Sequence, residues 1–80
     1  MTEKRITLIQ LKLDQRARVA AVRGGAACEG RLMAMGIFPG RELVKKSHFA
    51  LRGPVTIKIG RSVVALGHGM AGKIDVVPVQ

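Results

Sequence analysis

Polar and apolar residues alternate in short stretches along the chain, a pattern that predicts a mainly β protein. The clearest stretch is Val55–Ile59, whose three apolar residues share one face while its Thr and Lys face water. Gly60 and Arg61 then give the two-residue spacing of a tight hairpin before Ser62–Leu66. The remaining predicted strands are Arg16–Val22, Glu42–His48 and residues 74–77.

Residues 26–35 have helical rather than alternating periodicity. Cys28, Leu32 and the final Met recur at i, i+4 and i+7 and would form the buried stripe of a short helix. Gly36 follows in the position of a left-handed C-cap, and Ile37 after it can fold back onto the helix. We therefore expect one helix, ended sharply at the glycine.

About five short strands and one helix favour a single domain over residues 1–80. Curling such strands into a small barrel hides their edges and lets one side of each strand share a core. The predicted fold class is mainly β, a small SH3-like barrel of about five strands with one short helix, which would close one barrel end. Thr7 is predicted to cap a helical turn near the N-terminus, and Phe38-Pro39-Gly40 to form a turn after the helix.

The charge balance favours acidic partners. The net charge is +9, from 14 Lys and Arg against 5 Asp and Glu, and the cations are scattered along the chain. Single-stranded nucleic acid is bound largely by stacking on exposed aromatic side chains. The chain has no Trp or Tyr and two phenylalanines, Phe38 and Phe49, and we expect both to be buried. Nucleic acid is therefore not the expected partner.

Cysteine usage and hydropathy favour a cytoplasmic location. The single cysteine, Cys28, excludes an internal disulfide framework and fits a reducing compartment. Polar residues interrupt the first apolar stretch, so we expect no secretory signal, and no apolar run reaches the length of a membrane helix.

The glycine-rich stretch at residues 67–72 matches G-x-G-x-x-G, yet we interpret it as a structural turn. Dinucleotide and P-loop motifs need a helix that starts beyond the glycines and directs its N-terminal amides at phosphate. Here Lys73 leads directly to a predicted strand, and Ile74 stands where a P-loop has its Mg²⁺-binding hydroxyl. We expect neither tight nucleotide binding nor hydrolysis.

No enzymatic site is predicted. Cys28 could be paired with His48 or His68 as a nucleophile and base, but it lies on the apolar stripe of the helix and neither histidine has a catalytic signature around it. The potential metal ligands are Cys28, Glu29, His48, His68, Met70 and Asp75. They lack the paired spacing of a structural zinc site, so we expect no cofactor, and ligand spacing does not indicate a transition metal ion.

Residues 31–40 read R-L-x-x-x-G-I-x-P-G without a gap. This is the most specific element of the ferrous-iron transport protein A (FeoA) family, which the order of these signals resembles over essentially the whole chain. Its fold-defining residues are Arg31, Leu32, Gly36, Ile37, Pro39 and Gly40. Two departures remove basic side chains that are usual in the family, since Gly30 and Gly67 stand in their places.

The resemblance implies a cytosolic accessory protein that docks on the cytoplasmic part of the membrane ferrous-iron transporter FeoB, which carries a GTP-binding domain. Such a protein would be peripheral to the inner membrane through its partner. As candidate contacts we take four basic residues expected to be exposed: Lys45, Lys46, Arg52 and Lys58. Two alternatives remain open: a trans-acting module related to the C-terminal domain of iron-dependent transcriptional regulators, and a small basic RNA-binding barrel.

Overall fold

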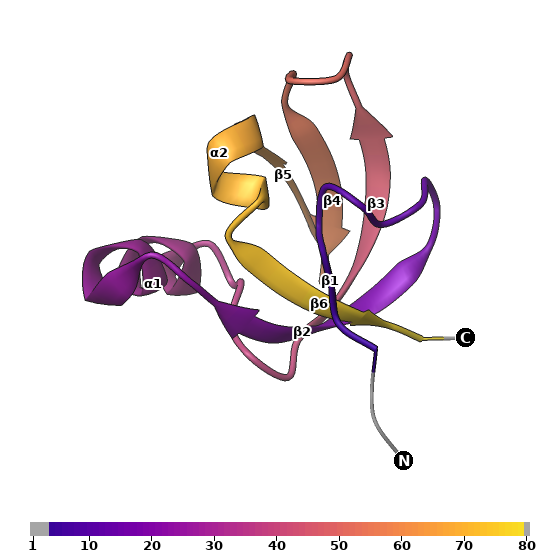
Figure 1. Cartoon of the computed structure of the whole chain (residues 1–80). Helices are drawn as coiled ribbons and strands as arrows, with labels where there is room; N and C mark the ends of the chain where they lie inside the picture. The colour runs from indigo at the N-terminus through magenta and orange to yellow at the C-terminus, as the bar shows by residue number, and fades with distance from the viewer. Residues whose placement is uncertain (1–3, 80) are drawn as a thin grey trace.

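The computed structural model describes residues 4–79 and contains six strands and two short helices (Figure 1). The strands are β1 (Ile6–Thr7), β2 (Arg16–Val22), β3 (Glu42–His48), β4 (Val55–Ile59), β5 (Ser62–Leu66) and β6 (Ile74–Pro78), and the helices are α1 (Gly25–Ala34) and α2 (His68–Ala71). The predicted mainly β class with one short helix, α1, is confirmed, and β1 and the single turn of α2 are additional elements.

The six strands form one antiparallel sheet in the order β1-β6-β2-β3-β4-β5. Strands β2 to β5 follow each other along the chain, whereas β6 returns to lie between β1 and β2. The sheet curls, so that one side of the strands encloses the core while α1 lies out to one side (Figure 1). Strands β2 to β5 have the predicted bounds, and β6 is one residue longer than predicted.

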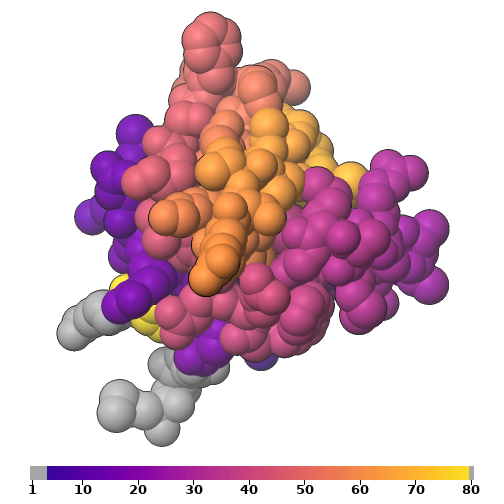
Figure 2. Space-filling view, turned by 180° about the vertical axis from the view of Figure 1, so that it is seen from behind, coloured from indigo at the N-terminus to yellow at the C-terminus, as the bar shows by residue number. Residues whose placement is uncertain are grey.

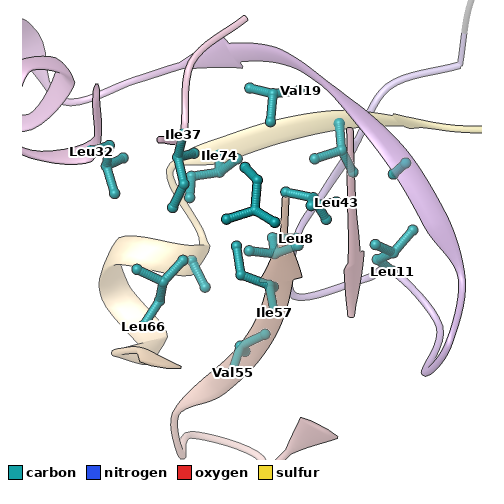
Figure 3. Close-up of a cluster of buried hydrophobic side chains, with 14 residues drawn as sticks. Leu8, Leu11, Val19, Leu32, Ile37, Leu43, Val55, Ile57, Leu66 and Ile74 are labelled. Atoms are coloured by element: carbon teal, nitrogen blue, oxygen red, sulfur yellow. The ribbon is translucent and has the colours of Figure 1, made fainter. Parts of the chain in front are cut away.

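The core consists of aliphatic side chains from every strand except β1, together with the N-terminal loop and both helices (Figure 3). Helix α1 contributes only Leu32 as a fully buried residue, with Cys28 and Met35 packed partly against the core. The helix therefore lies beside the sheet rather than across a barrel end, which corrects that expectation. The buried residues of this hydrophobic cluster are Leu8, Leu11, Ala17, Val19, Leu32, Ile37, Leu43, Val55, Ile57, Ile59, Leu66, Ala71, Ile74 and Val76.

The C-terminus of α1 is closed by a Schellman motif. Gly36 has a φ of 86°, and its N–H donates to Met33 O at 2.9 Å. The N–H of Ile37 donates to Leu32 O at 2.9 Å, and Ile37 itself is 1% exposed. These are the two hydrogen bonds that define the motif, and they satisfy carbonyl groups that the helix end leaves free. The predicted C-cap is confirmed.

The N-terminal turn is stabilised differently from the prediction. Thr7 is the last residue of β1 and does not cap a helix; instead its N–H donates to Gln10 Oε1 at 2.9 Å. The turn is closed by the N–H of Gln10, which donates to Thr7 O at 3.0 Å. The glutamine side chain thus accepts the N–H of Thr7, whereas a capping threonine hydroxyl would accept an N–H from within the turn.

Candidate interaction surface

The four candidate partner-binding residues all lie on the β3–β4 hairpin, but only three of them are exposed. Lys46 on β3, Arg52 in the connecting loop and Lys58 on β4 face solvent. Lys46 Nζ lies 3.0 Å from Asp14 Oδ1, and both side chains remain largely exposed. Such exposed pairs contribute little to stability, so this contact leaves Lys46 able to meet an acidic partner.

Lys45 is 2% exposed, which corrects the prediction that it belongs to the surface. Its cross-strand partner on β4 is Ile57, which is fully buried, and opposite residues of an antiparallel pair point to the same face. The ammonium group donates to Ile9 O and Leu11 O, at 2.8 Å in each case. Lys45 therefore fastens the N-terminal loop to the sheet and is not available to a partner.

A β-bulge places His48 on the same inner face as Lys45. The register shifts between Lys45 and Ser47, so Lys46 is an extra residue and His48 pairs with the buried Val55. Lys45 Nζ lies 3.2 Å from His48 Nδ1. Burial lowers the pKa of the Lys45 ammonium, because removal from water disfavours its charged form.

His48 and His68 lie close together beside this buried cation. Their ring centroids are 6.3 Å apart, and the buried atoms His48 Nε2 and His68 Nδ1 have no hydrogen-bond partner in the structure. The pKa of His48 is lowered by desolvation, then by the positive charge of Lys45 and by His68. The neutral imidazole is therefore favoured, as expected for a group beside a buried ammonium.

The loop between β3 and β4 carries two strongly exposed apolar side chains. Phe49 is 75% exposed, which corrects the expectation that both phenylalanines are buried, and Leu51 is 89% exposed. Phe38, the other phenylalanine, is half-buried under Arg41, whose Cζ lies 5.5 Å from the ring centroid. The aromatic ring that the sequence assigned to the core is thus at the surface.

An apolar pocket of about 160 Å³ opens between α1 and the turn that follows it. Met33, on the outer side of α1, is 59% exposed at its rim. The pocket is lined by Val22, Glu29, Met33, Ile37, Phe38 and Pro39. Two of the residues singled out as fold-defining, Ile37 and Pro39, therefore also form part of a surface pocket. This pocket was not predicted from the sequence, although three consecutive apolar residues after the helix, Ile-Phe-Pro, could have indicated an apolar surface there.

A second, wider hollow of about 380 Å³ lies between α1 and α2. Its lining includes the cations Arg31 and Lys73, and on its floor Cys28 Sγ lies 3.5 Å from Met70 Sδ. The glycine-rich stretch that resembled a nucleotide motif contains α2, a single helical turn ending before Lys73. A turn of this length inside the glycines differs from the long helix that would follow a phosphate-binding loop.

The potential metal ligands lie in pairs or singly and are not gathered into one site. Within residues 4–79, no group of three or more His, Cys, Asp and Glu side chains is placed to hold a metal ion. Asp75 forms an ion pair with Arg23, whose Nη2 lies 3.0 Å from the Oδ1 of the aspartate.

Neither helix within residues 4–79 has the length and apolar character of a membrane span.

Comparison with known proteins places this geometry in a family. A family model described as the FeoA domain matches residues 6–78. A solved iron uptake regulatory protein (FeoA) aligns with a TM-score of 0.85 and 25% identity over 95% of this chain and 99% of its own. The FeoA protein from Chlorobium tepidum aligns with a TM-score of 0.84 and 25% identity over 94% of this chain and 71% of its own.

The fold also occurs in a protein of another class. A manganese-dependent transcriptional repressor aligns with a TM-score of 0.88 over 99% of this chain and 44% of its own. At 20% identity this likeness concerns the fold alone. Together the structural matches confirm the predicted SH3-like fold. No curated protein sequence matches the chain at a significant level.

Proposed function

The chain belongs to the FeoA family, and on this basis we propose that it is a small accessory protein of bacterial ferrous-iron uptake that docks on the membrane transporter FeoB. The observation that carries the proposal is the family match over residues 6–78, which span every strand and both helices. In this proposal the chain acts by binding alone, without a cofactor. Its partner is the cytoplasmic part of the transporter, so it works in the cytoplasm at the inner membrane.

Charge supports an acidic docking partner. Residues 43–74 contain six Lys and Arg residues and no Asp or Glu. Lys46, Arg52 and Lys58 are the exposed members of this set on the β3–β4 hairpin. Complementary charges raise association rates and orient the partners, more than they add to affinity. An acidic face on the transporter would therefore be attracted to this hairpin.

The apolar pocket beside α1 supplies a second kind of contact. A volume of about 160 Å³ can receive one apolar side chain of a partner, and partly exposed Met33 adjusts its shape readily because the methionine side chain is flexible. Interfaces obtain most of their affinity from a few such buried anchors. With no Trp or Tyr in the chain, we expect a dissociation constant in the micromolar range, about 1 μM or weaker.

Calorimetry and pull-down against the soluble cytoplasmic domain of the transporter, and against the full transporter in detergent, test this proposal. Arg52→Ala should weaken binding more than Arg61→Ala, which removes the same charge from the β4–β5 turn. Met33→Glu at the pocket rim should weaken binding more than Leu13→Glu, because Leu13 is equally exposed, at 58%, away from the pocket. Raising the salt concentration should weaken the complex, since exposed charges are screened over about 8 Å at physiological ionic strength.

The repressor-like fold supports one alternative, a regulatory module that acts in trans. This alternative rests on the structural alignment to the manganese-dependent repressor, which has a TM-score of 0.88. Tight binding to DNA or RNA, together with no transporter binding at low salt, would favour the other alternative, a basic RNA-binding barrel. Equal loss of transporter binding in the paired variants would instead place the docking surface elsewhere on the chain.

A further inference from the structure

The β3–β4 loop projects from the body of the protein and presents two apolar side chains at its tip. Figure 1 shows the loop at the far end of the hairpin, and Figure 2 shows it standing clear of the surrounding surface at the top of the view. Phe49 and Leu51 are 75% and 89% exposed. Side chains this exposed make few apolar contacts with the rest of the chain, and an exposed apolar pair of this size favours a role in binding.

The backbone of the loop is closely constrained. The N–H of Phe49 donates to Pro54 O at 3.0 Å, which closes the loop at its base. Ala50, between the two apolar residues, has a φ of 60°, a conformation that L-residues rarely adopt. Gly53 packs so tightly that a Cβ there would overlap the carbonyl oxygen of Phe49. The apolar tip is thus displayed by a specific loop conformation, which its neighbours maintain.

The hairpin that carries the tip is positively charged. Arg52 follows Leu51 directly, whereas Lys46, which pairs with Asp14, and Lys58 lie further along the two strands on the outer face. The stretch 43–74, which contains the whole hairpin except Glu42, has no carboxylate. Apolar residues flanked by cations are the pattern of proteins that bind anionic bilayers, in which the apolar groups enter the headgroup region and the cations meet phosphate.

We propose that residues 49–52 insert Phe49 and Leu51 into the headgroup region of an anionic phospholipid bilayer, with Arg52 contacting lipid phosphate. A bilayer suits this tip better than a protein does, because two side chains on a convex loop need a deformable surface rather than a matching pocket. The inference goes beyond docking on a transporter. It is tested on lipid vesicles that contain no transporter, so the bilayer proposal and the transporter proposal can fail independently of each other.

The sequence itself offers a sensitive probe. The chain has no Trp or Tyr, so Phe49→Trp introduces one indole whose emission reports only on the tip. Vesicles of equal parts phosphatidylcholine and phosphatidylglycerol should shift this emission to shorter wavelength, and vesicles of phosphatidylcholine alone should do so much less. The matched control is Val63→Trp, at an exposed apolar position on β5 where Val63 is 67% exposed. Its emission should stay unchanged with both kinds of vesicle.

Co-sedimentation with the same vesicles measures the energetic role of the tip. The double variant Phe49→Ser, Leu51→Ser should lower the partition coefficient about tenfold or more, because two large apolar groups no longer leave water. Val63→Ser should change it little, and thermal melts establish that both variants are folded. An unshifted Phe49→Trp emission, or equal binding by the double variant and the wild type, would overturn the proposal in favour of purely electrostatic attraction. Binding of the tip to a soluble transporter domain but not to vesicles would also overturn it.

Discussion

Two glycines six residues apart should respond in opposite directions to the same substitution. Gly36 has a φ of 86°, and a Cβ built there meets nothing closer than Arg41 Nη2 at 4.0 Å. Gly36→Ala is therefore opposed by backbone strain alone, which costs roughly 1–2 kcal/mol for a residue held in the left-handed region. A domain of this size has about 4–12 kcal/mol of total stability, so the loss is a large share of it. Gly36→Val should cost still more, because a β-branched residue is least tolerated at positive φ.

Gly30 is the matched control, since it lies inside α1 with no atom within 4 Å of a Cβ placed there. Gly30→Ala should stabilise the protein by about 0.5–1 kcal/mol, because glycine in a helix interior loses more backbone freedom on folding. In thermal melts followed by circular dichroism, each kcal/mol shifts the midpoint by about 4–8 °C in a domain of this size. A Gly36→Ala midpoint equal to the wild type, or a fall with Gly30→Ala, would refute the assignment of the helix and its C-cap.

Three further predictions concern the β3–β4 hairpin. Lys45→Met should lower the free energy of unfolding by about 2–4 kcal/mol in urea titrations, because one buried and one partly buried carbonyl oxygen lose their donor. An unchanged midpoint would contradict the buried role of the ammonium. Because the pKa of His48 is lowered in the folded protein, the unfolded chain binds a proton at this imidazole more readily as the pH falls below 6.5. Acidification from about pH 7 to about pH 5 should therefore reduce the free energy of unfolding, and His48→Gln should make this loss smaller. Gly53→Ala should destabilise the loop by about 1–3 kcal/mol in thermal melts, because its Cβ overlaps the carbonyl oxygen of Phe49, and a neutral result would show that the loop relaxes freely.

The regular elements could be predicted because each has a local cause. The strict alternation of apolar and polar residues in Val55–Ile59, with a two-residue spacing after it, was enough to predict both strands of the β4–β5 hairpin. The helix end was predictable because Gly36 and Ile37 form a Schellman motif whose hydrogen bonds join residues close in sequence. Strand β1 was not predicted, because its two residues become a strand only by pairing with β6.

The candidate site was harder to predict, because residue type was given more weight than position. Lys45 is in the strand register of a core residue, opposite Ile57, yet it was assigned to the surface as a lysine. Phe49 was assigned to the core as an aromatic residue, although it comes directly after the end of β3. The bulge at Lys46, which turns His48 inward, has no signal in the sequence, since it is defined only by the register with β4.

The position of β6 determines when the sheet can form during biosynthesis. Ile74–Pro78 is synthesised after all the other strands, yet it lies between β1 and β2 and hydrogen-bonds to both. While the ribosome is still making residues 67–73, β1 has no neighbour and one edge of β2 is unpaired. Pairing between strands so distant along the chain also slows folding, because loop closure precedes the contacts that stabilise it. The nascent chain therefore remains incompletely folded, with one strand edge of β2 open, until β6 is free to pair with it.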